Sequence, residues 1–221
     1  MFQTLKNAWK IPELKNKILF TLMIIVLYRL GSSIPMPWIS PDLMEGGFMT
    51  NGALGWLNLL SGGALAQATL FALSVSPYIT ASIVIQLLTV AIPKLGELAK
   101  QGEEGKKVIN NITRYVTVAL ALITAFGYYM LIKRYNLLAV GAEGIWPALV
   151  IIVTLVAGSS FVMWMGEQIN EFGIGNGISM ILFAGIISRI PNAVSKMADG
   201  VSMWSAVKKG ELSVEMLVEA G

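Results

Sequence analysis

The sequence predicts an all-α protein that crosses a membrane several times. Of its 221 residues, 55% are hydrophobic and only 13% are charged, and the mean hydropathy is +0.69. This balance is too apolar for an ordinary soluble domain. Apolar blocks recur between polar segments, and a block of roughly 20 residues is long enough to cross a bilayer as a helix. We therefore expect a polytopic membrane protein with five transmembrane helices.

The first apolar block, residues 18–34, follows a cytoplasmic basic tail, residues 1–17, that carries four lysines. A cleaved signal peptide is the alternative. However, the block is longer than the roughly 7–15 apolar residues of a signal peptide, contains Arg29 and has no A-x-A cleavage pattern after it. We interpret it as a retained first span, in which Arg29 snorkels to the outer interface or has a function of its own.

The second span is predicted over residues 64–92. Before it, the external segment 35–63 is polar and rich in glycine and proline, except for GWLNLL at residues 55–60, a helical stretch too short to span. Pro77 removes a backbone donor within the second span, so we predict a kink whose freed carbonyl is satisfied by a neighbour or a cavity. An ordinary kink packed by small residues is the alternative.

The rest of the chain alternates in the same way between polar and apolar segments. The fifth span is short by the 20-residue rule unless it is tilted or lined by protein. The predicted segments are a cytoplasmic loop at 93–111, span three at 112–132, an external loop at 133–145, span four at 146–165, a cytoplasmic glycine-rich loop at 166–177, span five at 178–190 and an external polar segment at 191–221.

Basic residues set the predicted orientation. With the N-terminus inside, nine lysines and arginines are cytoplasmic, four in the tail and five between Lys94 and Arg114, and five are external. Because short cytoplasmic loops carry an excess of basic residues, this distribution favours a cytoplasmic N-terminus.

The predicted loop 166–177 reads GEQINEFGIGNG, in which Gly173, Gly175 and Gly177 alternate with larger residues. Alternate glycines permit positive φ and close backbone approach, so the loop can fold tightly against a partner. A simple tight turn is the plain alternative. A nucleotide site is disfavoured, because GIGNG is not G-x-G-x-x-G and follows an apolar span instead of a strand.

Enzyme chemistry finds little support in the composition. The chain has no cysteine and no histidine, which removes thiol ligation, the commonest metal ligand and the usual general base. A Walker A motif and paired carboxylates at a defined site are also missing. We expect no catalytic, metal-binding or cofactor-binding residues, and no enzyme activity.

Four motifs carry a resemblance to a known family. They are YRLGSSIPMP (28–37), SGGALAQATLFALSVSPYITASIVIQLL (61–88), KQGEEGKKVINNITRY (100–115) and MWMGEQINEFGIGNGISMILFAGIIS (163–188). In this order they resemble the SecY family, the protein-conducting channels of the bacterial secretory pathway. The resemblance runs from about residue 18 to residue 191.

The resemblance implies ten spans in two pseudo-symmetric halves that close like a clamshell around a pore. This chain would supply the first five spans and a short plug-like half helix, and it ends before a sixth span. The second span would be the helix beside the lateral gate. The plug region would comprise Trp56, Leu57, Leu59, Leu60, Gly62 and Gly63.

Matched motif to motif, the resemblance places Val75, Ile79, Ile178 and Leu182 at the pore constriction. Each pair is four residues apart and so shares one helical face. A ring of aliphatic side chains is wetted poorly and offers no fixed polar contact to a passing polypeptide. Packing against lipid or another helix is the alternative for such pairs.

The function implied is that of the central subunit, N-terminal half, of a channel that moves unfolded preproteins across the bacterial cytoplasmic membrane and inserts membrane proteins into it. Expected partners are SecE-type and SecG-type subunits, the SecA motor ATPase, the ribosome, signal-bearing preproteins, membrane lipid and the missing C-terminal half. Docking of cytoplasmic partners would use Lys100, Lys106 and Lys107. A secondary transporter with a midplane broken-helix site is the alternative, disfavoured because spans two to four contain no carboxylate that could couple ions or protons.

Overall fold

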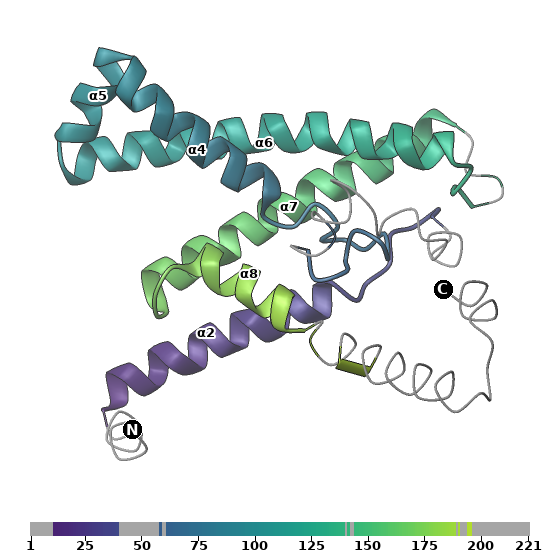
Figure 1. The fold of residues 1–221 in the computed structure, drawn as a ribbon, viewed down its shortest axis with the longest axis horizontal. Helices are drawn as coiled ribbons and strands as arrows, with labels where there is room; N and C mark the ends of the chain where they lie inside the picture. Colours follow the sequence, from purple (N-terminus) through teal and green to yellow (C-terminus); the bar gives the residue numbers. More distant parts are fainter. Residues whose placement is uncertain are drawn as a thin grey trace, which may run out of the picture.

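The computed structural model describes residues 11–39, 58, 61–139, 141, 144–188, 190 and 194–195. Within these residues every regular element is a helix, and β-type backbone pairing is limited to two isolated bridges. The helices, shown in Figure 1, are α2 (Pro12–Gly31), α4 (Ser76–Ala91), α5 (Pro93–Lys100), α6 (Glu103–Arg134), α7 (Ile145–Phe172) and α8 (Gly177–Ile187).

Helices α6 and α7 are the longest elements and run in opposite directions (Figure 1). Where they converge, Ala125, Ile132, Ile151 and Leu155 are fully buried in one hydrophobic cluster. By length and composition both helices can cross a membrane, and the bent pair α4 and α5 can count as a third span. The apolar helix α8 is shorter, so the number of five spans stays a prediction.

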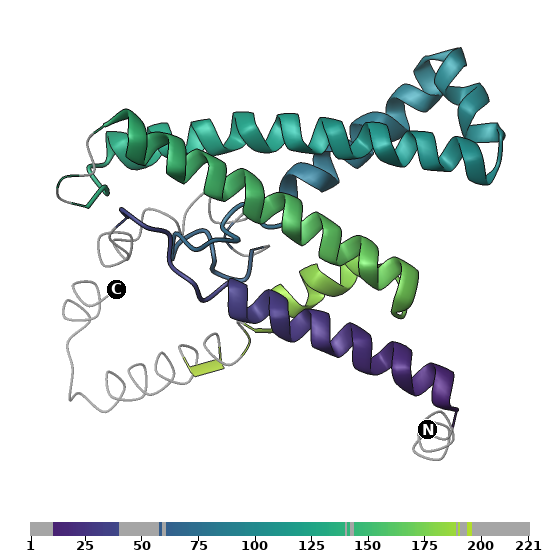
Figure 2. The same cartoon turned by 180° about the vertical axis from the view of Figure 1, so that it is seen from behind.

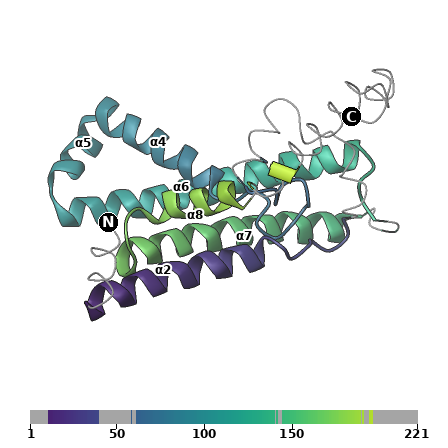
Figure 3. The ribbon, with the colours of Figure 1, turned by 60° about the horizontal axis from the view of Figure 1, so that its bottom comes forward.

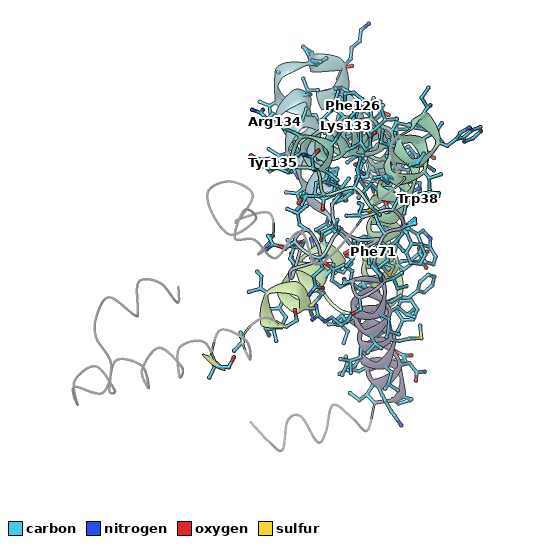
Figure 4. The ribbon with its side chains drawn as sticks, turned by 90° about the vertical axis from the view of Figure 1, so that its right-hand side faces the viewer. Trp38, Phe71, Phe126, Lys133, Arg134 and Tyr135 are labelled. Carbon is cyan, nitrogen blue, oxygen red and sulfur yellow. The ribbon has the colours of Figure 1, made fainter. Side chains whose placement is uncertain are left out.

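Helix α7 lies between α6 on one side and α2 on the other, as Figure 2 shows from behind and Figure 3 from below. A second hydrophobic cluster joins α2, α7, α8 and the start of α4. Phe71 contributes to it by stacking on Tyr28 of α2 at 5.8 Å and on Phe161 of α7 at 6.0 Å between ring centroids. In Figure 4, Phe71 lies where α2, in purple, meets the rest of the bundle.

The second predicted span is helical only in its second half. Residues 61–75 form a series of turns, and α4 begins at Ser76. Ala68 at φ 47° and Ser74 at φ 49° have left-handed backbone, which cannot continue an α-helix. The prediction of one continuous helix over 64–92 was therefore wrong.

The predicted solvated loop at 93–111 is largely helical. Pro93 opens α5, which bends by 102° from α4, and Gly102 at φ 74° provides the turn into α6. A side chain at Gly105 would collide with the backbone carbonyl of Leu98, so the three helices meet in a tight corner that only glycine permits. Helix α6 thus starts nine residues before the predicted third span, at Glu103 instead of residue 112.

The predicted glycine-rich loop at 166–177 is also mostly helical, because α7 continues to Phe172 and α8 begins at Gly177. Residues 173–176 remain as the connecting turn. Gly173 packs against α2, where a Cβ would lie 2.6 Å from the hydroxyl oxygen of Thr21. The tight fold against a neighbouring element was predicted; its short length was not.

Candidate functional site

The four residues predicted at the constriction lie together, where α4, α7 and α8 meet. Val75 and Ile178 are buried at 1% and 9% exposure, and Ile79 and Leu182 pack against the same hydrophobic cluster. Residues more than 95 positions apart in the sequence are thus brought to one place. Their role as a pore lining stays a prediction.

The start of α4 fixes the position of the first pair. Val75 is the N-cap residue, and its carbonyl accepts the first hydrogen bond from the Ile79 amide at 3.0 Å. Pro77 falls in the first turn, where its missing N–H would have no intrahelical partner and its fixed φ suits the helix. The prediction that Pro77 kinks a continuous gate helix was therefore wrong: it starts the helix.

Two glycines bring α8 close to α7, which positions the second pair. A Cβ on Gly177 would collide with the Gly166 carbonyl, and a Cβ on Gly166 would collide with the side chain of Ile178. Because both positions lack a Cβ, α8 can pack its first turn directly on the α7 backbone.

Polar side chains hold the turn between α7 and α8. Asn170 Oδ1 accepts a hydrogen bond from the Gly177 amide at 2.7 Å, and Asn176 Oδ1 caps α8 by accepting from the Ser179 amide at 3.2 Å. Thr21 of α2 accepts from the Ile174 amide at 3.1 Å. The turn is therefore anchored both to its own helices and to α2.

A hollow of about 290 Å³ opens between α4 and the α7–α8 turn. Its wall includes three of the four predicted constriction residues, whereas Val75 lies deeper in the cluster. None of the described residues that line it is charged. The lining residues are Tyr78, Ile79, Ser82, Ile83, Asn170, Asn176, Ile178, Ser179 and Leu182.

An ion pair joins α6 to α7 near this hollow. Arg114 Nε lies 2.7 Å from Glu167 Oε1, with side-chain exposures of 49% and 19%. The pair fixes the relative position of the two helices at the end where α7 enters its turn, although a partly exposed pair of this kind contributes only about 1 kcal/mol or less.

The predicted plug region is described only at Gly62 and Gly63, which have φ of 66° and 94°. A Cβ on Gly62 would lie 2.9 Å from the Gly185 carbonyl oxygen, so this turn rests directly on α8. The other predicted plug residues, Trp56, Leu57, Leu59 and Leu60, lie outside the described residues.

The predicted docking lysines lie at the corner of α5 and α6. Lys100 ends α5, and Lys106 and Lys107 occupy the first turns of α6, all three exposed. Lys106 approaches Glu103 at 3.9 Å, a weak surface contact. Their side chains are accessible at the surface, which a docking role requires.

Known proteins share both sequence and fold with this chain. The SecY family model matches residues 69–219, which is more than half of the chain. The chain belongs to the SecY family. The protein translocase subunit SecY of Staphylococcus epidermidis is 42% identical over 203 residues, which cover 91% of this chain and 47% of that protein. The Staphylococcus aureus subunit is 44% identical over 194 residues, covering 86% and 45%.

The chain therefore spans about half the length of the curated SecY relatives it matches. Two solved structures share its fold, each with a TM-score of 0.60 and 19% identity, covering 91% of this chain and 43% of the other. One is described as the structure of a protein conducting channel, the other as Sec61 in the canine ribosome-channel complex from the endoplasmic reticulum.

Sequence reasoning missed three polar residues of this SecY-family site: Thr21, Asn170 and Asn176. Asn176 had a readable signal, because an asparagine directly before an apolar helical run is a common N-cap. Asn170 and Thr21 had none, since their partners are backbone amides seven and 153 residues away.

Proposed function

We propose that this chain is the N-terminal half of the central subunit of a protein-conducting channel. The channel moves unfolded preproteins across the bacterial cytoplasmic membrane and inserts membrane proteins into it. The observation that carries the proposal is the meeting of Val75, Ile79, Ile178 and Leu182 in one hydrophobic cluster, beside a hollow that the last three line, in a chain of the SecY family.

The chemistry of this cluster suits a constriction. Aliphatic side chains resist wetting and form no strong polar contacts, so they oppose ion flow without holding a passing polypeptide. Half of such a ring lies on this chain. The remaining half, and the opposite wall of the pore, would come from a C-terminal half, consistent with relatives about twice as long.

The segment around Gly62 and Gly63 is proposed to carry the plug, and α4 to border the lateral gate. Support comes from the position of this turn, which lies against Gly185 of α8 on the element that carries Ile178 and Leu182. A plug attached here would lie next to the proposed constriction.

The partners proposed are SecE-type and SecG-type subunits, the SecA motor, the ribosome, signal-bearing preproteins and membrane lipid. With the N-terminus cytoplasmic, the α5–α6 corner faces the cytoplasm and presents Lys100, Lys106 and Lys107. Exposed lysines attract acidic protein surfaces or RNA phosphates, which suits docking of the motor or the ribosome.

Complementation tests the proposal. This chain is co-expressed with a separate second half of SecY in cells depleted of SecY, and export of a signal-bearing reporter is followed. We expect the pair to restore export, and Ile79→Lys or Ile178→Lys to reduce it by about tenfold or more, because a charge in the ring is strongly solvated and binds water and peptide.

The matched controls are Ile79→Leu and Ile178→Leu, which keep the ring aliphatic and should export normally. Immunoblots of membrane fractions establish that every variant is inserted. Absence of export despite stable insertion of both halves would contradict the channel function, and normal export by the lysine variants would contradict the assigned constriction.

A further inference from the structure

Two asparagines at the hollow present amide groups that the aliphatic constriction does not use. We propose that Asn170 and Asn176, with Ser82 and Ser179, form an uncharged collar that hydrogen-bonds to backbone carbonyls of an extended polypeptide approaching the constriction. This inference rests on the proposed function, because it concerns the same site and names the part of the substrate that the site contacts.

The collar and the constriction share one hollow. The side chains of Asn170, Asn176, Ser82 and Ser179 line the same volume of about 290 Å³ as Ile79, Ile178 and Leu182. This volume is just below the range of roughly 300–1,000 Å³ that small-molecule pockets occupy, so it suits a short extended segment and excludes a folded one. A chain entering the constriction from this side passes the polar groups first.

The internal hydrogen bonds of the two asparagines decide which groups face the hollow. In each, Oδ1 is already engaged by a backbone amide, Asn170 by Gly177 and Asn176 by Ser179. Each side chain keeps an NH2 group with two donors, and neither NH2 group has a hydrogen-bond partner among the described residues. The collar therefore offers hydrogen-bond donors on side chains whose orientation is already fixed by their Oδ1 hydrogen bonds.

The collar is also free of charge. Of the two neighbouring carboxylates on α7, that of Glu167 is bound by Arg114 at 2.7 Å, and that of Glu171 is exposed and does not line the hollow. An amide NH2 group donates to an oxygen acceptor, and the acceptor present in every residue of a polypeptide is the backbone carbonyl. Such contacts do not discriminate between acidic and basic segments.

The strength of these contacts suits a moving substrate. A hydrogen bond between neutral groups exchanges with water at little net gain, so no register of the chain is held tightly. An amide that meets successive carbonyls can keep a chain extended in front of the constriction and still release it at each step.

Contact is tested by cysteine cross-linking in membrane vesicles that contain the intact protein. The chain has no cysteine of its own, so Ser82→Cys and Ser179→Cys each introduce a single thiol with little change in size. The probe is a preprotein with one cysteine, stalled in transit by a folded C-terminal domain. We expect disulfides at 82 and 179, and none from the control Tyr115→Cys, which is 78% exposed on α6.

The hydrogen-bonding role is tested with Asn170→Asp and Asn176→Asp. Aspartate keeps the oxygen that the Gly177 or Ser179 amide requires and removes the NH2 donors. We expect the double variant to slow transit of neutral, acidic and basic preproteins alike, by about three- to tenfold, the factor expected for losing a neutral hydrogen bond. The control Asn136→Asp, in the exposed turn after α6, adds one of the two negative charges of the double variant, away from the hollow and from the docking lysines, and should leave the rate unchanged.

The outcomes separate this inference from the proposed function. If the unmodified protein transports preproteins but the collar cysteines form no disulfide, or the double variant transports all three preproteins at the normal rate, the collar is overturned and the channel stands. Slowing of the acidic preprotein alone also overturns it, because that is the effect of added charge. Failure of the unmodified protein to transport any preprotein overturns the channel function, and the collar with it.

Discussion

Helices α6 and α7 bond their backbone groups internally, whereas the segment 61–75, packed beside them, combines irregular backbone hydrogen bonds with bonds to side chains. The Leu65 and Ala66 amides donate to Ser61 Oγ and Asn58 Oδ1 at 3.2 and 3.0 Å. From the long helices, Tyr128 donates to the Leu65 carbonyl at 2.8 Å and Ser159 to the Ser74 carbonyl at 3.3 Å. The two helices satisfy their backbone groups within themselves, whereas the irregular segment also needs partners from other elements.

This difference shows where non-helical backbone can be placed in a membrane protein. Away from water, every backbone N–H and C=O must find a partner, so irregular backbone survives only where protein surrounds it. Segment 61–75 meets this condition because most of its side chains are buried and because α6 and α7 supply hydroxyl groups toward it. The long helices tolerate many substitutions, and the segment should tolerate few.

The largest expected effect comes from adding a methyl group where α7 directly contacts this segment. A Cβ on Gly158 would collide with the Leu70 carbonyl oxygen, which belongs to backbone and cannot rotate away. We expect Gly158→Ala to destabilise the protein by about 2–3 kcal/mol, as overpacking does elsewhere. Thermal unfolding of the detergent-solubilised protein, followed by size-exclusion chromatography, measures it.

Gly127 on α6 is the matched control, because it has no atom within 4 Å of an added Cβ. Gly127→Ala should stabilise by up to about 1 kcal/mol through helix propensity alone. Equal effects of the two substitutions would show that the close approach of Leu70 to α7 does not limit stability.

A smaller effect is expected from the hydrogen bond that α6 donates to the segment. Tyr128→Phe leaves the buried Leu65 carbonyl without its side-chain donor and should cost about 1–2 kcal/mol. The neighbouring Tyr129 is equally buried but makes no hydrogen bond to the described residues, so Tyr129→Phe should cost less. The same unfolding assay compares them, and a larger loss for Tyr129→Phe would refute the role of the Tyr128 contact.

The long helices were predictable from sequence, and the irregular segment was not. Hydrophobicity alone identified spans three and four within α6 and α7, because an apolar run of that length has few other solutions. The run from Ala64 to Ile92 is equally apolar, so it was predicted as one helix. A continuous helix is prevented by residues with left-handed backbone and by turns whose hydrogen-bond partners are distant in sequence. Composition does not encode either feature.

The candidate site, too, was predictable from sequence only in part. The resemblance selected Val75, Ile79, Ile178 and Leu182, their spacing agreed with it, and the structure gathers them in one hydrophobic cluster. The sequence also contained the signal that Pro77 starts a helix, since proline is favoured in the first turn, but the apolar run before it hid that boundary. The amide of Asn176 could have been predicted as an N-cap, whereas the role of Asn170 came to light only when its hydrogen-bond partner was known.

The smallest expected effect concerns Ala68, where the segment departs most from a helix. At φ 47° an L-residue is strained by roughly 1–2 kcal/mol. Ala68→Gly removes this strain but loses a buried methyl group, worth about 0.8 kcal/mol, and makes the unfolded chain more flexible by a similar amount. These terms oppose each other, so we expect a net change within about 0.5 kcal/mol in the unfolding assay.

Ala125 provides the comparison, because it belongs to the same hydrophobic cluster and is fully buried, but lies within α6. There the methyl loss and the poor helix propensity of glycine act in the same direction, so Ala125→Gly should cost about 2 kcal/mol. If Ala68→Gly costs as much, the left-handed backbone at Ala68 stores no strain. The irregular segment would then behave in this respect like the helices beside it.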